Sequence, residues 1–430
     1  MFINKILQKT GLDKFISPGT FKNISTLMTG TVIAAIIPIL SSPIMARIFT
    51  SASYGVLGLY MSISGLIGVI AYSHYSNAIM LPKENSDARQ VLWFSVCISS
   101  SISLLALLTI VSLYFFTNVI NFSSIGLWYF FIPLSIFLNG FNATLLVWAN
   151  RVKKYRKLSF NKVVQALITV VVQIALGILI KNETGLMVGL ILGQAISVFL
   201  LLYAFSNSGD FGIGLPQKNA FKAVAVKYKD FLFFGTPTDF INNLINQIPI
   251  FMLQKFGGIT YVGYYNFTQR ILGLPQIFLS SAIVDVFRQK ASYNYSHYGN
   301  CKDIFEKTFK VLSLIGLIPF LVIMLFAPSI FGFIFGQQWV TAGVFAQFLG
   351  IMFFFRFIVS PLSYVYILAN RLREDFILHL LFLAMTTASF YISNYFFVNK
   401  NLMILTYACT YSLVYVVYLI RSYKFSKGNL

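Results

Sequence analysis

Apolar segments of about 20 residues recur along the whole chain, separated by short polar or glycine-, proline- and asparagine-rich stretches. A helix of this length crosses the hydrocarbon core of a bilayer. Charged residues make up 10% of the 430 residues, whereas soluble domains carry about 25%. Because backbone polar groups in lipid must find partners within their own segment, we expect these segments to be helices. The pattern predicts an all-α polytopic membrane protein and excludes most classes of soluble enzyme.

About twelve transmembrane helices are expected from these runs. They cover residues 27–46, 54–80, 91–117, 127–149, 163–180, 185–205, 231–254, 262–287, 308–327, 341–369, 376–398 and 402–420. An even number of spans places both ends of the chain on the same side of the membrane.

Lysine and arginine are distributed unequally over the connections between these helices. Twenty-six of them fall in the terminal segments and in alternate connections, against four in the opposite set. Positively charged loops stay on the cytoplasmic side, so both termini are predicted to be cytoplasmic. The formal net charge of +20 therefore indicates topology and contact with anionic membrane lipid. No nucleic acid partner is expected.

The two halves of the chain begin with similar residues. Arg47 and Gly55 share an eight-residue spacing with Lys255 and Gly263, at an offset of 208 residues. Six helices in each half would give both the same orientation and relate them by a pseudo-two-fold axis along the membrane normal. The predicted organisation is a lobe over 1–206, a cytoplasmic linker over 207–230 and a second lobe over 231–430, with the substrate site between the lobes.

A polar stripe runs along the helix expected at 231–254. Its members recur at the spacing of one helix face and are Asp239, Asn242, Asn243, Asn246 and Gln247. Such a face is too polar to contact lipid. We expect it either to line a central cavity or to form hydrogen bonds with neighbouring helices.

Three arginines are candidates for binding an anion. Arg270 and Arg356 lie inside expected spans, where a charge costs about 2.5–3.5 kcal/mol, and each faces either an anionic substrate group or a fixed structural partner. Arg47 ends the first span and is either an interfacial anchor or a residue at the cavity mouth. Gln269 is a candidate for the same substrate. His74 can titrate near neutral pH and is either an ion-coupling residue or a packed side chain.

No motif for enzymatic chemistry is found. The three cysteines, Cys97, Cys301 and Cys409, lie far apart in the sequence and show no spacing typical of a metal site. The sequence contains neither a phosphate-binding lysine loop nor the common hydrolase and metalloprotease motifs. We expect no metal, no cofactor and no enzymatic activity.

Several stretches resemble one family of membrane proteins. In the first half they are residues 30–31, 43–50, 54–55 and 77–83, which read GT, PIMARIFT, YG and NAIMLPK. In the second half residues 262–275 read VGYYNFTQRILGLP. The chain resembles the O-antigen and capsular polysaccharide unit flippases of the multidrug/oligosaccharidyl-lipid/polysaccharide exporter superfamily, and the likeness in helix number and topology extends over most of its length.

The resemblance implies a substrate and a mechanism. An undecaprenyl-diphosphate-linked oligosaccharide would pass from the cytoplasmic to the outer leaflet of the bacterial inner membrane by alternating access, coupled to a proton or sodium gradient. Arg47 and Arg270 fall on matching motif positions, whereas Arg356 does not. No motif fixes the coupling acid, so Asp239 is our own candidate. A polysaccharide polymerase and a chain-length regulator are expected partners.

Two other functions are considered. A gradient-driven efflux pump for hydrophobic cations would need a cavity dominated by carboxylates, whereas here two arginines accompany one deep acid. A membrane polysaccharide polymerase or ligase would carry a sizeable outer loop with arginine and histidine, whereas the expected outer loops are short.

Overall fold

The chain folds into two bundles of long helices. The computed structural model describes residues 18–72, 75–116, 124–206, 218–229 and 231–428. The N-terminal half contains α2 (Pro18–Leu40), α3 (Ser42–Ile48), α4 (Ser51–Tyr72), α5 (Tyr75–Ala78), α6 (Asn85–Phe116), η3 (Gly126–Phe131), α7 (Ile132–Arg151), α8 (Tyr155–Ile180) and α9 (Thr184–Ser206). A short helix, α10 (Lys218–Lys227), belongs to the connector.

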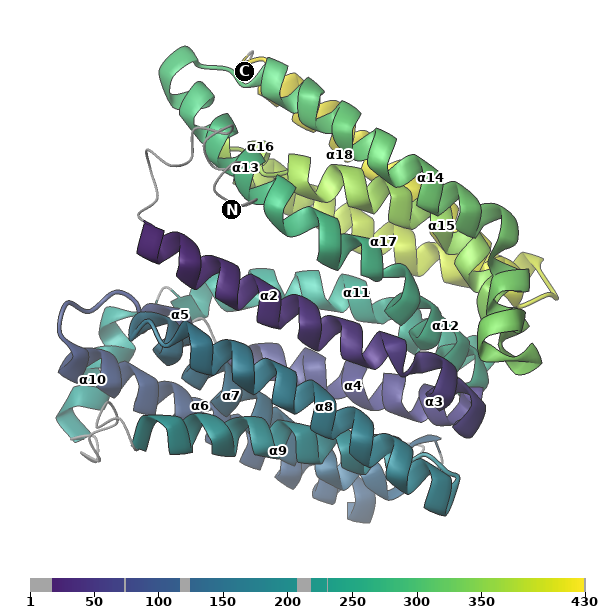
Figure 1. Ribbon diagram of the computed structural model, residues 1–430, viewed down its shortest axis with the longest axis horizontal. Coiled ribbons are helices and arrows are strands. Elements are labelled where there is room, and N and C mark those ends of the chain that lie inside the picture. Colours follow the sequence, from purple (N-terminus) through teal and green to yellow (C-terminus); the bar gives the residue numbers. More distant parts are fainter. Residues whose placement is uncertain (1–17, 73–74, 117–123, 207–217, 230, 429–430) are drawn as a thin grey trace.

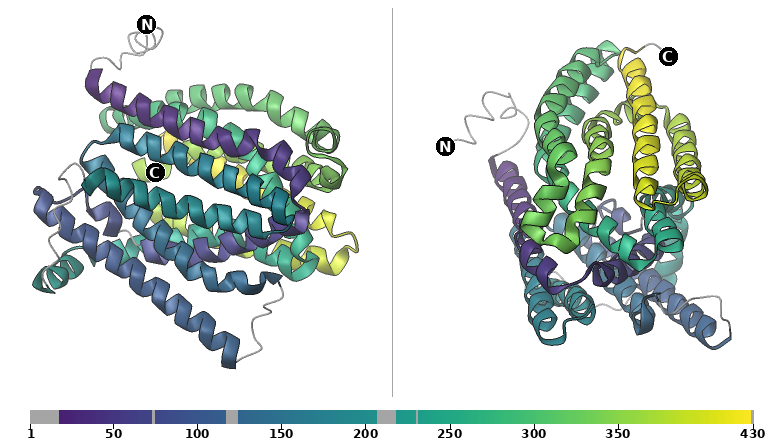
Figure 2. Two further views of the ribbon diagram at one scale, coloured as in Figure 1. Left: turned by 60° about the horizontal axis from the view of Figure 1, so that its bottom comes forward. Right: turned by 90° about the vertical axis from the view of Figure 1, so that its right-hand side faces the viewer.

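The C-terminal half begins at Phe231. It contains η4 (Phe231–Gly235), α11 (Thr236–Gly257), α12 (Ile259–Leu272), α13 (Leu274–Tyr298), α14 (Lys302–Phe335), η5 (Gln337–Trp339), α15 (Val340–Leu362), α16 (Val365–Leu368), α17 (Leu372–Phe396) and α18 (Asn401–Ser426). The right-hand view of Figure 2 shows the green and yellow helices of the second half above and the blue helices of the first half below. The described residues form no strand, so the protein is an all-α polytopic membrane protein.

Ten helical segments among the described residues are long and apolar enough to cross a membrane. The other two predicted spans are also helical, as α11 and as α12 followed by α13. The α11 helix carries the polar stripe, and α12 is only 14 residues long.

The molecule has two different ends. One end, here called the basic end, carries the connections at 79–84, 152–154, 299–301 and 369–371, which the cation count assigns to the cytoplasm. The opposite end, here called the closed end, carries α3 and the starts of α4 and α12. In Figure 1 the two halves meet near α3 and α12 and diverge toward the basic end.

The halves join where α4 crosses α12. A Cβ added to Gly55 would lie 2.0 Å from the backbone oxygen of Ile259, and one added to Gly263 would lie 1.7 Å from the oxygen of Ser51. The 208-residue offset of the internal repeat pairs Ser51 with Ile259 and Gly55 with Gly263. The contact of Gly55 with Ile259 and the contact of Gly263 with Ser51 are therefore equivalent under the repeat. Such reciprocity is typical of an interface about a two-fold axis. The contact supports the internal repeat predicted from the sequence.

An apolar core continues across this junction. One cluster of buried side chains includes Phe49 and Tyr54 of the N-terminal half together with Phe267 and Trp339 of the C-terminal half. The rings of Phe267 and Trp339 stack with centroids 4.1 Å apart. A second cluster fills the basic end of the N-terminal half and, among described residues, includes none beyond residue 232. Burial of apolar side chains therefore joins the halves at the closed end.

Several helix boundaries differ from the prediction. The helix predicted at 163–180 begins at Tyr155, the one predicted at 91–117 begins at Asn85, and the last helix ends at Ser426 and not at 420. The first helix begins at Pro18, nine residues before the predicted start at 27, whereas its segment long and apolar enough to cross a membrane begins at Thr29. Most of the predicted loop at 288–310 is helical, because α13 continues to Tyr298 and α14 begins at Lys302. The predicted helix 262–287 is interrupted at Gly273, since Pro275 restarts the helix as one of its first residues, where a missing N–H is tolerated.

Replacing Gly55 by leucine is expected to lower the free energy of unfolding by about 1–3 kcal/mol, because an added side chain forces the tightly packed backbones apart. The matched control is Gly65→Leu on the same helix, where an added Cβ meets no atom within 4 Å. Thermal unfolding of both purified variants measures the difference. Equal melting temperatures would contradict the role of the close crossing.

Candidate functional site

Arg270 joins the two halves of the molecule. It lies on α12, and its Nη2 donates a hydrogen bond to the backbone oxygen of Pro38 on α2 at 2.8 Å. Eleven residues separate it from the start of α12, a rise of about 17 Å, which is close to the middle of a hydrocarbon core about 30 Å thick. The sequence-predicted arginine therefore lies at mid-depth between the halves.

The Arg270 side chain has unused binding capacity. A guanidinium carries five N–H donors. Among the residues that the structure describes, the carbonyl of Pro38 is its hydrogen-bond acceptor, and no carboxylate lies within ion-pair distance. A charge at this depth normally faces a partner or a watery space. The arrangement leaves donors available for an anionic ligand.

An aromatic plug lies between Arg270 and the closed end. Tyr54 packs edge-to-face against Phe267 and Trp339, with ring centroids 5.2 and 5.3 Å apart. Trp339 Nε1 and Gln338 Nε2 both donate to the backbone oxygen of Ala46, at 2.8 and 2.6 Å. These side chains come from both halves, so they close the space between the halves on this side.

The polar stripe of α11 is hydrogen-bonded within its own helix. Asn246 Nδ2 donates to the backbone oxygen of Asn242 at 2.7 Å. Gln247 Nε2 donates to Asn243 Oδ1 at 3.3 Å. In the described part of the chain, these four amide side chains form no hydrogen bond with another helix. Interhelical hydrogen bonding among the described residues therefore does not explain these four amides.

The position of α11 favours contact between the stripe and water. The helix packs against α4 of the N-terminal half and against α12 and α17 of its own half. Asn246 is exposed, and so is Asp239, which lies in the first turn. Exposed amides and a carboxylate in hydrocarbon would be costly. We therefore propose that this face meets water.

Arg356 lies inside the C-terminal half instead. It is half-buried on α15, and its guanidinium carbon lies 5.9 Å from the ring centroid of Phe353. Four phenol groups lie within electrostatic range of it, and they belong to Tyr265, Tyr407, Tyr411 and Tyr415. Among the described residues no carboxylate pairs with Arg356 and no acceptor receives a hydrogen bond from it. We call Arg356 and these four tyrosines the tyrosine chamber.

Gln269 belongs to the tyrosine chamber and not to the surroundings of Arg270. Its Nε2 donates to the hydroxyl of Tyr265, which lies 3.5 Å from the hydroxyl of Tyr407. Consecutive residues on a helix point about 100° apart, so Gln269 and Arg270 face different neighbours. The structure thus divides the predicted site into a junction site and a chamber within one half.

The sequence analysis did not predict the tyrosines of the chamber as part of a site. Tyr407, Tyr411 and Tyr415 recur every four residues on α18. This spacing places them on one face. A tyrosine stripe opposite an unpaired arginine is a signal that could have identified them.

The remaining predicted residues lie elsewhere. Arg47 is exposed in the last turn of α3, where a cation favours the negative end of the helix dipole. It has no hydrogen bond or ion pair with the described residues, and the structure does not bring it together with Arg270 or Arg356. His74 lies outside the described residues, so its predicted role stays a prediction. No group of three metal-ligating side chains occurs in the described ranges.

Comparison with known proteins identifies related sequences and folds. A family model described as "Polysaccharide biosynthesis protein" matches residues 44–343, which confirms the resemblance noted in the sequence. No curated protein matches significantly.

Solved structures share the fold at low sequence identity. One is an inward-facing multidrug resistance MATE family transporter of the MOP superfamily, with 15% identity, a TM-score of 0.58, and coverage of 92% of this chain and 93% of that chain. A second is the MATE multidrug transporter DinF-BH, with 16% identity, a TM-score of 0.59, and coverage of 94% and 92%. A third is a MOP superfamily transporter from Pyrococcus furiosus described by the reverse polarity of its binding pocket, with 15% identity, a TM-score of 0.56, and coverage of 94% and 96%. The fold is thus that of the MATE transporters.

Replacing Arg356 by leucine is expected to leave the melting temperature unchanged or to raise it, because the change removes a half-buried charge that no carboxylate compensates. The matched control is Arg151→Leu. Arg151 donates to the backbone oxygens of Ile79 and Pro82 at 2.8 and 2.7 Å, so its loss should cost about 2 kcal/mol. Thermal unfolding compares the two variants. An equal loss of stability would show that Arg356 is a structural residue.

Proposed function

The chain belongs to the family of polysaccharide biosynthesis proteins, and from this premise we propose that it is a flippase for a lipid-linked oligosaccharide. The substrate would be an undecaprenyl-diphosphate-linked repeat unit, as in O-antigen assembly. One observation carries the proposal: Arg270 lies at mid-depth between the two halves with no described carboxylate beside it. A cation in that position suits the diphosphate of such a lipid.

The chemistry of the substrate matches the side chains at the junction. A diphosphate that leaves water needs charged donors to replace its hydration, and arginine provides paired N–H groups for phosphate oxygens. Sugar hydroxyls need donors and acceptors, which Asn242, Asn243 and Asn246 supply. The polyprenyl chain can remain in lipid while the head group crosses between the halves.

Arg356 would provide a second cationic position. A bare guanidinium surrounded by phenol groups attracts an anion more strongly than it would in water, because the surrounding dielectric is low. Tyr265 and Gln269 of this chamber lie on α12, the helix that also carries Arg270. We propose that the head group interacts with Arg270 first, and that Arg356 attracts it into the C-terminal half.

The closed end would face the outer side of the membrane. The basic end carries most of the cations and would be cytoplasmic by the positive-inside rule, with both termini in the cytoplasm of the bacterial cell. In this state the plug of Tyr54, Phe267 and Trp339 closes the outer side, and the substrate would enter from the cytoplasmic leaflet. Alternating access would then require the lobes 1–206 and 231–430, joined by the linker 207–230, to rock about the α4–α12 crossing.

Coupling to an ion gradient stays a prediction. Asp239 is exposed in the first turn of α11, at the basic end of the polar stripe, where a proton or a sodium ion from the cytoplasm could reach it. His74 stays a candidate from the sequence, as does Arg47 for substrate binding at the outer end. A polysaccharide polymerase and a chain-length regulator would use the delivered units.

Multidrug efflux is the second candidate, because MATE multidrug transporters share the fold. Such a pump binds hydrophobic cations, and two arginines without described carboxylate partners would repel them. A drug-susceptibility assay on a deletion strain distinguishes the two functions. Hypersensitivity to cationic drugs together with normal surface polysaccharide would favour efflux.

Arg270→Ala is expected to reduce surface polysaccharide at least tenfold, since the loss of one charge-assisted contact removes about 1.5–3 kcal/mol of binding. The assay is complementation of a deletion strain, followed by determination of the leaflet that retains the lipid-linked unit. Arg373→Ala is the control, because Arg373 is an exposed cation in the first turn of α17. Normal polysaccharide from a well-expressed Arg270→Ala protein would refute the proposed role.

A cysteine at position 246 should react with a water-soluble maleimide applied from the cytoplasmic side. The three native cysteines are first replaced, and labelling is compared in inside-out and right-side-out vesicles. Val171→Cys is the control, because Val171 on α8 is 60% exposed but apolar and expected to face lipid. Equal labelling at the two positions would contradict a watery space beside α11.

A further inference from the structure

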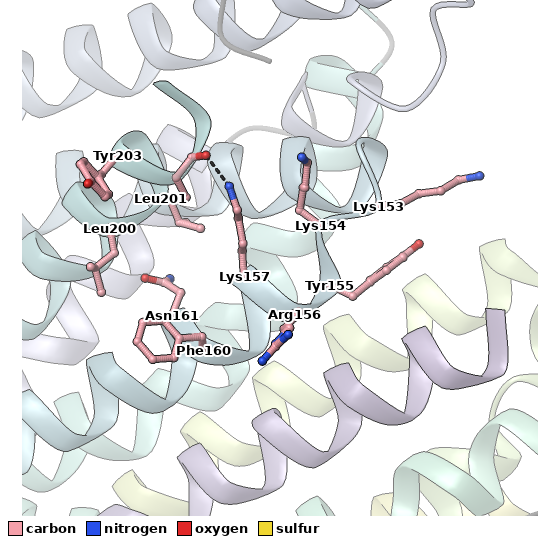
Figure 3. Close-up of a pocket in the computed structure, with 11 residues that line it drawn as sticks. Lys153, Lys154, Tyr155, Arg156, Lys157, Phe160, Asn161, Leu200, Leu201 and Tyr203 are labelled. Carbon is pink, nitrogen blue, oxygen red and sulfur yellow. Dashed lines mark hydrogen bonds between the residues drawn. The ribbon is translucent and has the colours of Figure 1, made fainter. Parts of the chain in front are cut away.

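A groove at the basic end lies outside the site described above. It is formed by the start of α8 and the end of α9 and has a volume of about 680 Å³. Figure 3 shows Phe160 and Asn161 of α8 facing Leu200, Leu201 and Tyr203 of α9. We call it the α8–α9 groove. Neither Arg270 nor Arg356 lines it.

The groove is strongly cationic. Its lining includes four consecutive or near-consecutive basic residues, Lys153, Lys154, Arg156 and Lys157, and none of its described lining residues is acidic. They fan out from the start of α8 in Figure 3. Lys153 and Arg156 are exposed. These two exposed cations favour a ligand that carries negative charge.

Helix α8 adds to this preference. It begins at Tyr155 without a side-chain cap and without an acidic residue in its first turn. The N–H groups of a first turn have no acceptor within the helix, and the positive end of the helix dipole favours an anion there. The helix dipole and the cations therefore both favour an anion at the start of α8.

The opposite part of the groove is apolar and open. Phe160 is 63% exposed and Tyr203 is 59% exposed. The ring of Tyr203 stacks on that of Phe199, which is also exposed. Aromatic side chains of this kind gather where membrane proteins meet the head groups. A ligand that matches both parts has an anionic head and a hydrocarbon chain.

We propose that the α8–α9 groove binds an anionic glycerophospholipid of the cytoplasmic leaflet. The phosphate diester would lie beside Arg156 and the neighbouring lysines, and an acyl chain would follow Phe160, Leu200 and Tyr203. Basic pockets between spans on the cytoplasmic side are suited to such head groups. A sugar-bearing lipid fits less well, because the one amide of the lining, Asn161, is buried and bonded to Ser197 at 2.7 Å.

The lipid would hold the helices around the groove together. Lys157 Nζ donates to the backbone oxygen of Ala204 at 2.6 Å and so bridges α8 and α9. Ser159 Oγ donates to the backbone oxygen of Thr26 at 3.1 Å and so joins α8 to α2. A phospholipid bound at this position would contact helices that these bonds already join, whatever the protein transports.

The test uses the full chain in detergent, titrated with dioleoyl phosphatidylglycerol and followed by native mass spectrometry. Lys153→Gln/Arg156→Gln should weaken the first binding event about 30-fold, which corresponds to about 1 kcal/mol for each cation. Arg156→Gln alone should weaken it about fivefold. The matched control is Lys290→Gln/Lys307→Gln, which removes two exposed cations from a basic-end groove that also contains Asp303. It should leave the affinity unchanged.

Four results would overturn the proposal. The first is an equal loss of phosphatidylglycerol affinity in the two double variants, and the second is an affinity for dioleoyl phosphatidylcholine equal to that for phosphatidylglycerol. The third is binding of glycerol phosphate, which has no acyl chains, as tight as that of phosphatidylglycerol. The fourth is the absence of saturable phosphatidylglycerol binding by the unaltered protein. The first would indicate general surface charge, and the third a site for a free phosphate compound. Unchanged melting temperatures of the variants establish that any loss of binding is local.

Discussion

Two helices can approach until their backbones touch only where neither has a side chain at the crossing. This condition is met where α4 crosses α12, because Gly55 and Gly263 each face the backbone of the other helix. The two halves are fixed to each other here, and the apolar core continues between them through Tyr54, Phe267 and Trp339. The crossing therefore determines which end of the molecule is closed. If one half moves against the other, it must either pivot about this contact or break it.

The electrostatics of the interior follow from the same arrangement. Because the halves meet at the closed end, Arg270 on α12 reaches Pro38 on α2 at mid-depth, and α11, which carries the polar stripe, packs against α4. Arginines normally offset the cost of leaving water with a carboxylate partner. Arg270 and Arg356 have none among the described residues, and a protein that keeps such charges gains an anion-binding capacity that a paired arginine lacks.

Much of the fold and part of the site could be predicted from the sequence. The apolar runs, the distribution of cations and the polar stripe of α11 all depend on local spacing, which the sequence contains directly. The repeat of Gly55 and Gly263 was also visible as a spacing. The grouping of Gln269 with Arg356 was not visible, because it depends on which neighbour each side of α12 contacts. The role of the tyrosines of α18 could not be predicted for the same reason.

The sequence by itself determined that the chain spans a membrane many times, which loops carry the cations and which helix faces are polar, because hydropathy and helical periodicity act within single segments. The tertiary structure decided that the halves close at one end, that Arg270 bonds to a carbonyl of the other half, and that Arg356 lies among tyrosines. These features depend on packing between segments distant in sequence. Periodicity fixes the direction of a side chain relative to its own helix, but not the neighbour that it meets.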